Sequence, residues 1–113
     1  MEEANAVKLI IDQNHKDKNV FEELDLHNCK LDQAWVILHA IIEEIKSWLL
    51  SGRLLYNKDG YYKIKIITGW GKHSKILGKS KIKMMVHSEL KWMDIVMVEG
   101  GKKGGYVKAY FYK

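Results

Sequence analysis

Two ionisable residues early in the sequence have the types and spacing that acid–base chemistry uses. Asp25 and His27 alternate with leucines in the segment Leu24-Asp25-Leu26-His27, so they share one face of a short predicted strand. A carboxylate at this spacing can hydrogen-bond the imidazole and fix its tautomer for general base or acid catalysis. The competing interpretation is a capping carboxylate beside a structural histidine, and the pair taken alone favours it.

A glycine-flanked loop forms the second cluster, with the sequence Thr68-Gly69-Trp70-Gly71-Lys72-His73-Ser74. Glycines let backbone amides come close to a phosphate, and the lysine, histidine and serine could add charge and hydrogen bonds. Trp70 could stack on a base or anchor the loop to the edge of a sheet, and the sequence favours neither. The loop fits neither the GxxxxGKS/T nor the GxGxxG pattern, so alone it is a weak sign of a phosphate site.

Other residues that could do chemistry have ordinary structural interpretations. Cys29 is expected to be a small packing residue, because no activating pattern surrounds it. Trp35 and Trp48 are expected in the core, and His39 and His87 are expected to be partly buried or at the surface of helices.

The charge of the 113-residue chain is divided unevenly along its length. Residues 1–60 hold 7 basic and 11 acidic side chains, whereas residues 61–113 hold 12 basic and 3 acidic ones, and the formal net charge is +5. A basic half predicts a polyanionic partner, with a phosphate backbone the commonest, and a solvated lysine surface is the alternative. With 47% hydrophobic residues, one cysteine and no apolar run of the roughly 20 residues that a membrane helix needs, we expect an intracellular globular domain without a membrane partner, in cytoplasm, nucleus or an organelle.

Hydrophobic periodicity predicts six elements in the order β-α-β-α-β-β. Strands are expected at residues 20–27, 61–68, 94–99 and 106–112, and helices at residues 31–51 and about 80–90. Ile82, Met85, Val86 and Leu90 point inward on the second helix, and its other face is expected to carry Lys79, Lys81 and Lys83. The first half predicts parallel strands joined by helical crossovers, and the last two strands an antiparallel hairpin. Both polar clusters follow strands, at the edge where open α/β sheets bind ligands.

These residues also carry a family resemblance. Leu24-Asp25-Leu26-His27, followed by Ala34 seven positions after the histidine, resembles the LDLHGxxxxxxA signature of Smr (small MutS-related) domains, and residues 68–74 match their TGxGxHS motif. The resemblance covers about residues 20–113, which leaves 1–19 as an extension or linker. Asn28 replaces the usual glycine, and asparagine tolerates the left-handed backbone that a turn there can require.

The resemblance implies a two-layer α/β sandwich on a mixed four-stranded sheet, similar to the C-terminal domain of a bacterial translation initiation factor. It also implies an endonuclease domain that binds nucleic acid, cleaves RNA or nicks DNA, and acts as a monomeric part of a larger protein. Asp25, His27 and His73 would be catalytic. The substrate would contact Thr68, Gly69, Trp70, Gly71, Lys72, Ser74, Lys79, Lys81 and Lys83, with the backbone of both loop glycines on the scissile phosphate.

Two other functions stay open at this point. One is a non-catalytic module that binds RNA or the ribosome, and the other is a protein-interaction domain with solvated lysines. A divalent metal cofactor also stays open, because Asp25 and His27 could contribute to a site but no second carboxylate motif lies near them, and no residue is assigned as a metal ligand.

Overall fold

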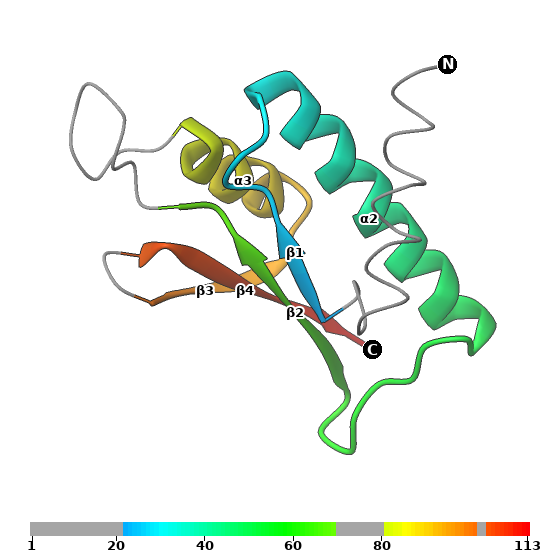
Figure 1. Cartoon of the computed structure of the whole chain (residues 1–113). Helices are drawn as coiled ribbons and strands as arrows, with labels where there is room; N and C mark the ends of the chain where they lie inside the picture. Colours follow the sequence, from blue (N-terminus) through cyan, green and yellow to red (C-terminus); the bar gives the residue numbers. More distant parts are fainter. Residues whose placement is uncertain (1–21, 70–80, 102–103) are drawn as a thin grey trace.

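The computed structural model describes residues 22–69, 81–101 and 104–113. Their elements run β1 (Glu23–Asp25), α2 (Leu31–Ser51), β2 (Tyr61–Ile67), α3 (Lys81–Trp92), β3 (Val96–Gly100) and β4 (Tyr106–Tyr112) (Figure 1). This order confirms the predicted succession of strands and helices. The predicted boundary between an extension and the domain, at residues 19 and 20, lies outside the described residues.

The strands form one mixed sheet in the order β1-β2-β4-β3. β1 and β2 are parallel, as a crossover through a helix requires, and β3 and β4 form an antiparallel hairpin. β4 also pairs antiparallel with β2 and so takes an inner position. The parallel pair and the hairpin are as predicted. The insertion of β4 between β2 and β3 follows from long-range pairing, which no local sequence pattern reports.

Both helices lie on one side of the sheet, which gives the expected two layers (Figure 1). α2 buries an apolar stripe, Ala34, Ile37, Leu38, Ile41, Ile42, Ile45 and Leu49. α3 adds Ile82, Val86 and Leu90, and the strands add alternate residues, Leu24, Ile64, Ile66, Val107, Ala109 and Phe111. The core therefore lies between the two layers. Among the described residues, no helix or strand covers the opposite face of the sheet.

Trp35 is not a core residue, and the prediction that placed it there is wrong. It is 45% exposed, and Leu31 one turn earlier is 44% exposed. Ile37, two residues after Trp35, is buried at 1% exposure. Trp35 falls at the margin of the buried stripe, toward α3, and Leu31 is the first residue of the helix.

The helix ends explain where the following segments begin. α2 ends at Gly52, whose φ of 80° gives the left-handed backbone that stops a helix. Two residues after the end of α3, Asp94 has a φ of 57°. The amides of Asp94 and Ile95 donate to the carbonyls of Lys91 and Leu90. This Schellman turn occupies residues 93–95, so β3 begins at Val96, two residues later than predicted. No helix in the described ranges has the length and apolar character to cross a membrane.

Candidate functional site

β1 buries its leucines and presents Asp25 and His27 to solvent. Leu24 and Leu26 are 1% and 0% exposed, against 50% and 44% for the side chains of Asp25 and His27. The amide of Leu26 still donates to the carbonyl of Ile67 at 2.8 Å, so pairing with β2 continues past the last strand residue. The alternation in this segment therefore holds through His27.

Asp25 orients His27 through two contacts with one carboxylate oxygen. Nδ1 of His27 lies 2.5 Å from Oδ1 of Asp25, and the backbone amide of His27 donates to the same oxygen at 3.1 Å. Because an ionised carboxylate only accepts hydrogen bonds, Nδ1 carries the proton of a neutral imidazole and Nε2 keeps its lone pair. The pair therefore offers Nε2 as the basic atom.

Gly69 brings the second sequence motif against the first. β1 and β2 are parallel, so Thr68 and Gly69 leave β2 at the same edge of the sheet at which Asp25 ends β1. A Cβ placed on Gly69 would lie 3.4 Å from Cβ of His27, and the φ of Gly69 is 73°. Glycine at this position thus meets a backbone requirement, and only the room for one methyl group separates it from His27. The two motifs, about 40 residues apart in sequence, therefore lie side by side.

The backbone of Gly105 fixes the start of the glycine loop. Its carbonyl accepts from the amides of Thr68 and Gly69 at 3.0 and 2.9 Å, and the buried hydroxyl of Thr68 donates to the carbonyl of Gly69 at 3.1 Å. This corrects one expectation. The amide of Gly69 is already engaged within the protein, so it does not hold a phosphate, and Thr68 is 2% exposed and acts by holding the loop.

Two predicted substrate-binding lysines fall within α3, and they point in different directions. Lys81 is exposed at the first residue of the helix. Lys83 has a side chain only 16% exposed, and its Nζ donates to Oε1 of Glu99 on β3 at 2.9 Å. Residues two apart on a helix are about 200° apart around its axis, so they cannot share one face. The expectation that Lys83 lies on an open phosphate-tracking face with Lys81 is therefore wrong.

Glu99 lies between two basic residues of α3. The hydrogen bond from Lys83 holds the pKa of the Glu99 carboxyl below its ordinary value of 4.5, and His87 adds a weaker electrostatic contribution, with Nε2 at 3.9 Å from Oε2. A Cβ on Gly104 would lie 1.8 Å from Oε1 of Glu99, so this glycine leaves the room that the ion pair fills. The cluster ties α3 to the hairpin that supplies Gly105.

Most of the glycine loop lies outside the described residues. Trp70, Gly71, Lys72, His73 and Ser74, and also Lys79, belong to the segment 70–80. The structure therefore brings together Asp25, His27, Thr68 and Gly69 among the predicted site residues. It places Lys81 at the C-terminal end of the same loop.

Glu89 of α3 joins two aromatic residues of α2, a contact that was not predicted from the sequence. Oε1 of Glu89 accepts from Nε1 of Trp35 at 2.8 Å and lies 2.6 Å from Nε2 of His39. The two rings lie 4.0 Å apart between centroids. Helical periodicity identifies the buried face of each helix but does not say which residues of two helices meet. The one sequence signal for this contact is the spacing of Trp35 and His39, which are four residues apart and therefore lie on one side of α2.

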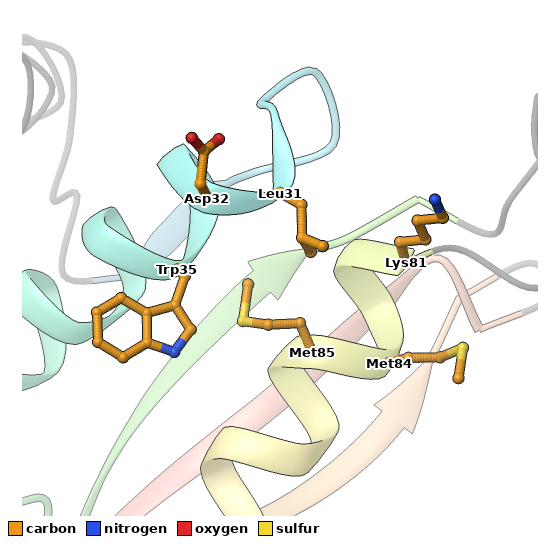
Figure 2. Close-up of a pocket in the computed structure, with 6 residues that line it drawn as sticks. All are labelled: Leu31, Asp32, Trp35, Lys81, Met84 and Met85. Carbon is orange, nitrogen blue, oxygen red and sulfur yellow. The ribbon is translucent and has the colours of Figure 1, made fainter.

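An open groove lies beside this contact, at the N-terminal ends of both helices. Figure 2 shows it between α2 and α3, with residues from both helices around it. Its lining is Leu31, Asp32, Trp35, Lys81, Met84 and Met85. The floor is therefore apolar, with one acidic and one basic side chain at its margin.

Cys29 lies close to the site and is partly buried. Burial raises the pKa of its thiol above the ordinary value, and the carboxylate of Asp25 raises it further. A thiol with a raised pKa is a poor nucleophile at neutral pH. Among the residues that the structure describes, no group of three or more His, Cys, Asp or Glu side chains is arranged to hold a metal ion.

Comparison with known proteins finds one informative similarity. No protein-family model matches the chain, and no curated protein matches it. A solved structure described as "Solution structure of the B3BP Smr domain" is similar, with a TM-score of 0.64 and 26% sequence identity over 100% of both chains. The chain therefore has an Smr-like fold, which agrees with the mixed sheet and the two-layer architecture described above.

Proposed function

We propose that this chain is an Smr domain that binds nucleic acid and cleaves RNA at the edge where β1 and β2 end. The observation that carries the proposal is that the two motifs lie side by side at one edge of the sheet. Gly69, which opens the TGxGxHS-type loop, lies against His27, whose imidazole Asp25 holds in a defined tautomer. The Smr-like fold supports the same assignment.

The chemistry starts at Nε2 of His27. This atom takes the proton of a ribose 2′-hydroxyl, and the 2′-oxygen then attacks the neighbouring phosphorus. The bond from phosphorus to the 5′-oxygen breaks, so the products carry a 2′,3′-cyclic phosphate and a 5′-hydroxyl. Asp25 stabilises the imidazolium that forms, because its carboxylate accepts the Nδ1 hydrogen bond. Proton transfer of this kind contributes about 10²- to 10⁴-fold to a rate.

Residues of the segment that follows Gly69 complete the proposed site. His73 protonates the leaving 5′-oxygen, and Lys72 balances negative charge on the phosphate. Backbone amides from Gly71 onward, with the hydroxyl of Ser74, hold the phosphate. Trp70 stacks on a base. Lys79 and Lys81 contact neighbouring phosphates of the strand.

A cleavage assay tests the proposal. Single-stranded RNA, duplex RNA and single-stranded DNA are incubated with the wild-type chain, Asp25→Asn and His27→Ala, each with and without a chelator. We expect His27→Ala to lower RNA cleavage by about 10²-fold or more. Asp59→Asn removes an exposed carboxylate from the turn before β2 and should cleave like the wild type.

The products decide between chemical routes. A cyclic phosphate and resistance of a 2′-deoxy substrate fit attack by the 2′-hydroxyl, whereas 5′-phosphate ends indicate attack by water. Cleavage that survives both site substitutions overturns the proposed site. RNA binding without cleavage, under every metal condition, would instead identify a non-catalytic RNA- or ribosome-binding module.

A further inference from the structure

The sheet face that points away from the helices carries four tyrosines and three lysines. Strand alternation places Tyr61, Lys63 and Lys65 of β2 on this face, with Tyr106, Lys108, Tyr110 and Tyr112 of β4 beside them. Their neighbours on each strand point into the core. We call these seven residues the open face. No described helix or strand covers it.

Three of the tyrosines form one aromatic cluster at the far end of the open face. The centroids of Tyr61 and Tyr110 lie 5.3 Å apart in an edge-on arrangement, and Tyr61 and Tyr112 lie 5.7 Å apart. Tyr112 is 57% exposed. Aromatic rings held by one another on a rigid sheet are preorganised surfaces for stacking.

The fourth tyrosine, Tyr106, lies at the other end of the open face. Two glycines make room for its ring, because a Cβ on Gly100 or Gly101 would lie 2.6 Å from ring atoms of Tyr106. Nζ of Lys65 lies 4.4 Å from the ring centroid. A base that stacks on this face of Tyr106 takes the place of the ammonium group, which then lies free to contact a neighbouring phosphate.

The open face leads directly to the candidate site. Asp25 pairs with Ile67, and Ile67 pairs with Tyr106, so these three residues form one row across the sheet. The pair of Tyr61 and Tyr112 lies six residues further along, about 20 Å at 3.3 Å per residue. Lys65 and Lys108 share the row between the aromatic cluster and Tyr106, and Lys63 lies beside Tyr110 within the cluster.

The charge of this surface selects a polyanion. Its three lysines outnumber the two acidic side chains that β1 places beside them, Glu23, whose Oε1 lies 3.6 Å from Nζ of Lys65, and Asp25 at the candidate site. Aromatic rings alternating with cations match a strand in which bases alternate with phosphates. Val96 and Val98 of β3, which are 50% and 53% exposed, add an apolar margin beside Tyr110 and Lys108. The lysines among the rings favour nucleic acid over a protein partner, because charged residues such as lysine are depleted at the core of protein interfaces.

We propose that the open face binds a single-stranded segment of nucleic acid, with bases stacked on Tyr61, Tyr112 and Tyr106 and phosphates on the lysines between them. The bound strand passes from the aromatic cluster toward Asp25 and His27. The inference rests on the proposed function, because it supplies the substrate path to that site. A duplex does not fit this path, because its bases are already stacked on one another and cannot reach the rings.

Fluorescence anisotropy with uncleavable oligonucleotides tests this path. The probes are 2′-O-methyl oligouridine and oligothymidine of about twelve nucleotides, within the usual site size, and a duplex of the same length. We expect Tyr112→Ser and Tyr61→Ser to weaken single-strand binding by about fivefold or more each, and Tyr112→Phe, which keeps the ring, to bind like the wild type. Lys63→Gln and Lys108→Gln should each reduce the slope of log affinity against log salt by about 0.7.

The matched control variants carry substitutions on the helices, away from the open face. Trp92→Ser removes an aromatic residue that is 80% exposed on α3, and Lys46→Gln removes an exposed lysine of α2. Both should bind like the wild type, and thermal unfolding checks that every variant is folded. Wild-type binding that no open-face substitution weakens overturns this inference and leaves the proposed function standing. A wild-type chain that binds neither single strand overturns both.

Discussion

Asp25 is the residue on which the candidate site converges. Its carboxylate accepts from the imidazole and the backbone amide of His27, and its charge acts on the thiol of Cys29. The contact with His27 could be predicted because the two residues are neighbours in sequence with a known alternation. The pairing of Lys83 with Glu99 could not, because it depends on how α3 meets β3.

The thiol of Cys29 reports the charge on Asp25. A negative charge nearby disfavours the thiolate, so Asp25→Asn should lower the pKa of Cys29, although burial keeps it above the ordinary value. At about pH 8 the variant should therefore react faster with iodoacetamide than the wild type. The measurement is the alkylation rate as a function of pH, with Asp59→Asn as the control. An unchanged or slower rate in Asp25→Asn would contradict the placement of the carboxylate.

At the scale of elements, the parallel pairing of β1 and β2 creates the site. α2 returns the chain so that both strands end at one edge, and this could be predicted from the helical stripe and the strand patterns. The position of β4 could not be predicted, although it brings the carbonyl of Gly105 to Thr68 and Gly69 and builds the open face. Local periodicity defines the faces of a strand but does not identify its neighbours.

Gly104 tests how α3 is tied to the hairpin. Gly104→Ala adds a Cβ that would displace Glu99 and Lys83, at a φ of 68° that disfavours any side chain. Gly60→Ala shares the positive φ of 86° but has nothing within 4 Å. We expect Gly60→Ala to lower the free energy of unfolding by about 1–2 kcal/mol from backbone strain. Gly104→Ala should cost up to about 1 kcal/mol more, from the loss of the ion pair.

Denaturant unfolding of both alanine variants measures this difference. Lys83→Met provides a second route to the same cluster, because it removes the ion pair without backbone strain. Equal losses in the two glycine variants would show that the ion pair contributes nothing to the attachment of α3.

At the scale of the whole molecule, the structure shows where the acidic and basic halves of the sequence lie. The acidic half supplies Asp25 and the helix α2 that packs on the sheet. The basic half supplies the glycine loop, Lys81 and every strand residue of β4, with Lys108 on the open face. Lysines that lie close together in the sequence thus have different roles in the structure. Lys83 forms an ion pair, Lys81 lies beside the glycine loop, and Lys108 lies on the open face. The composition predicted a polyanionic partner, but only the sheet topology shows which basic residues share a face.

A double-mutant cycle on RNA cleavage tests the central claim most directly. Cleavage rates of one single-stranded RNA are measured for the wild type, Asp25→Asn, His27→Ala and the double variant. Because Asp25 acts through the imidazole, we expect the double variant to be no slower than His27→Ala alone, within about threefold. Losses that multiply, or cleavage that neither substitution slows, would contradict the account of a single site built from Asp25 and His27.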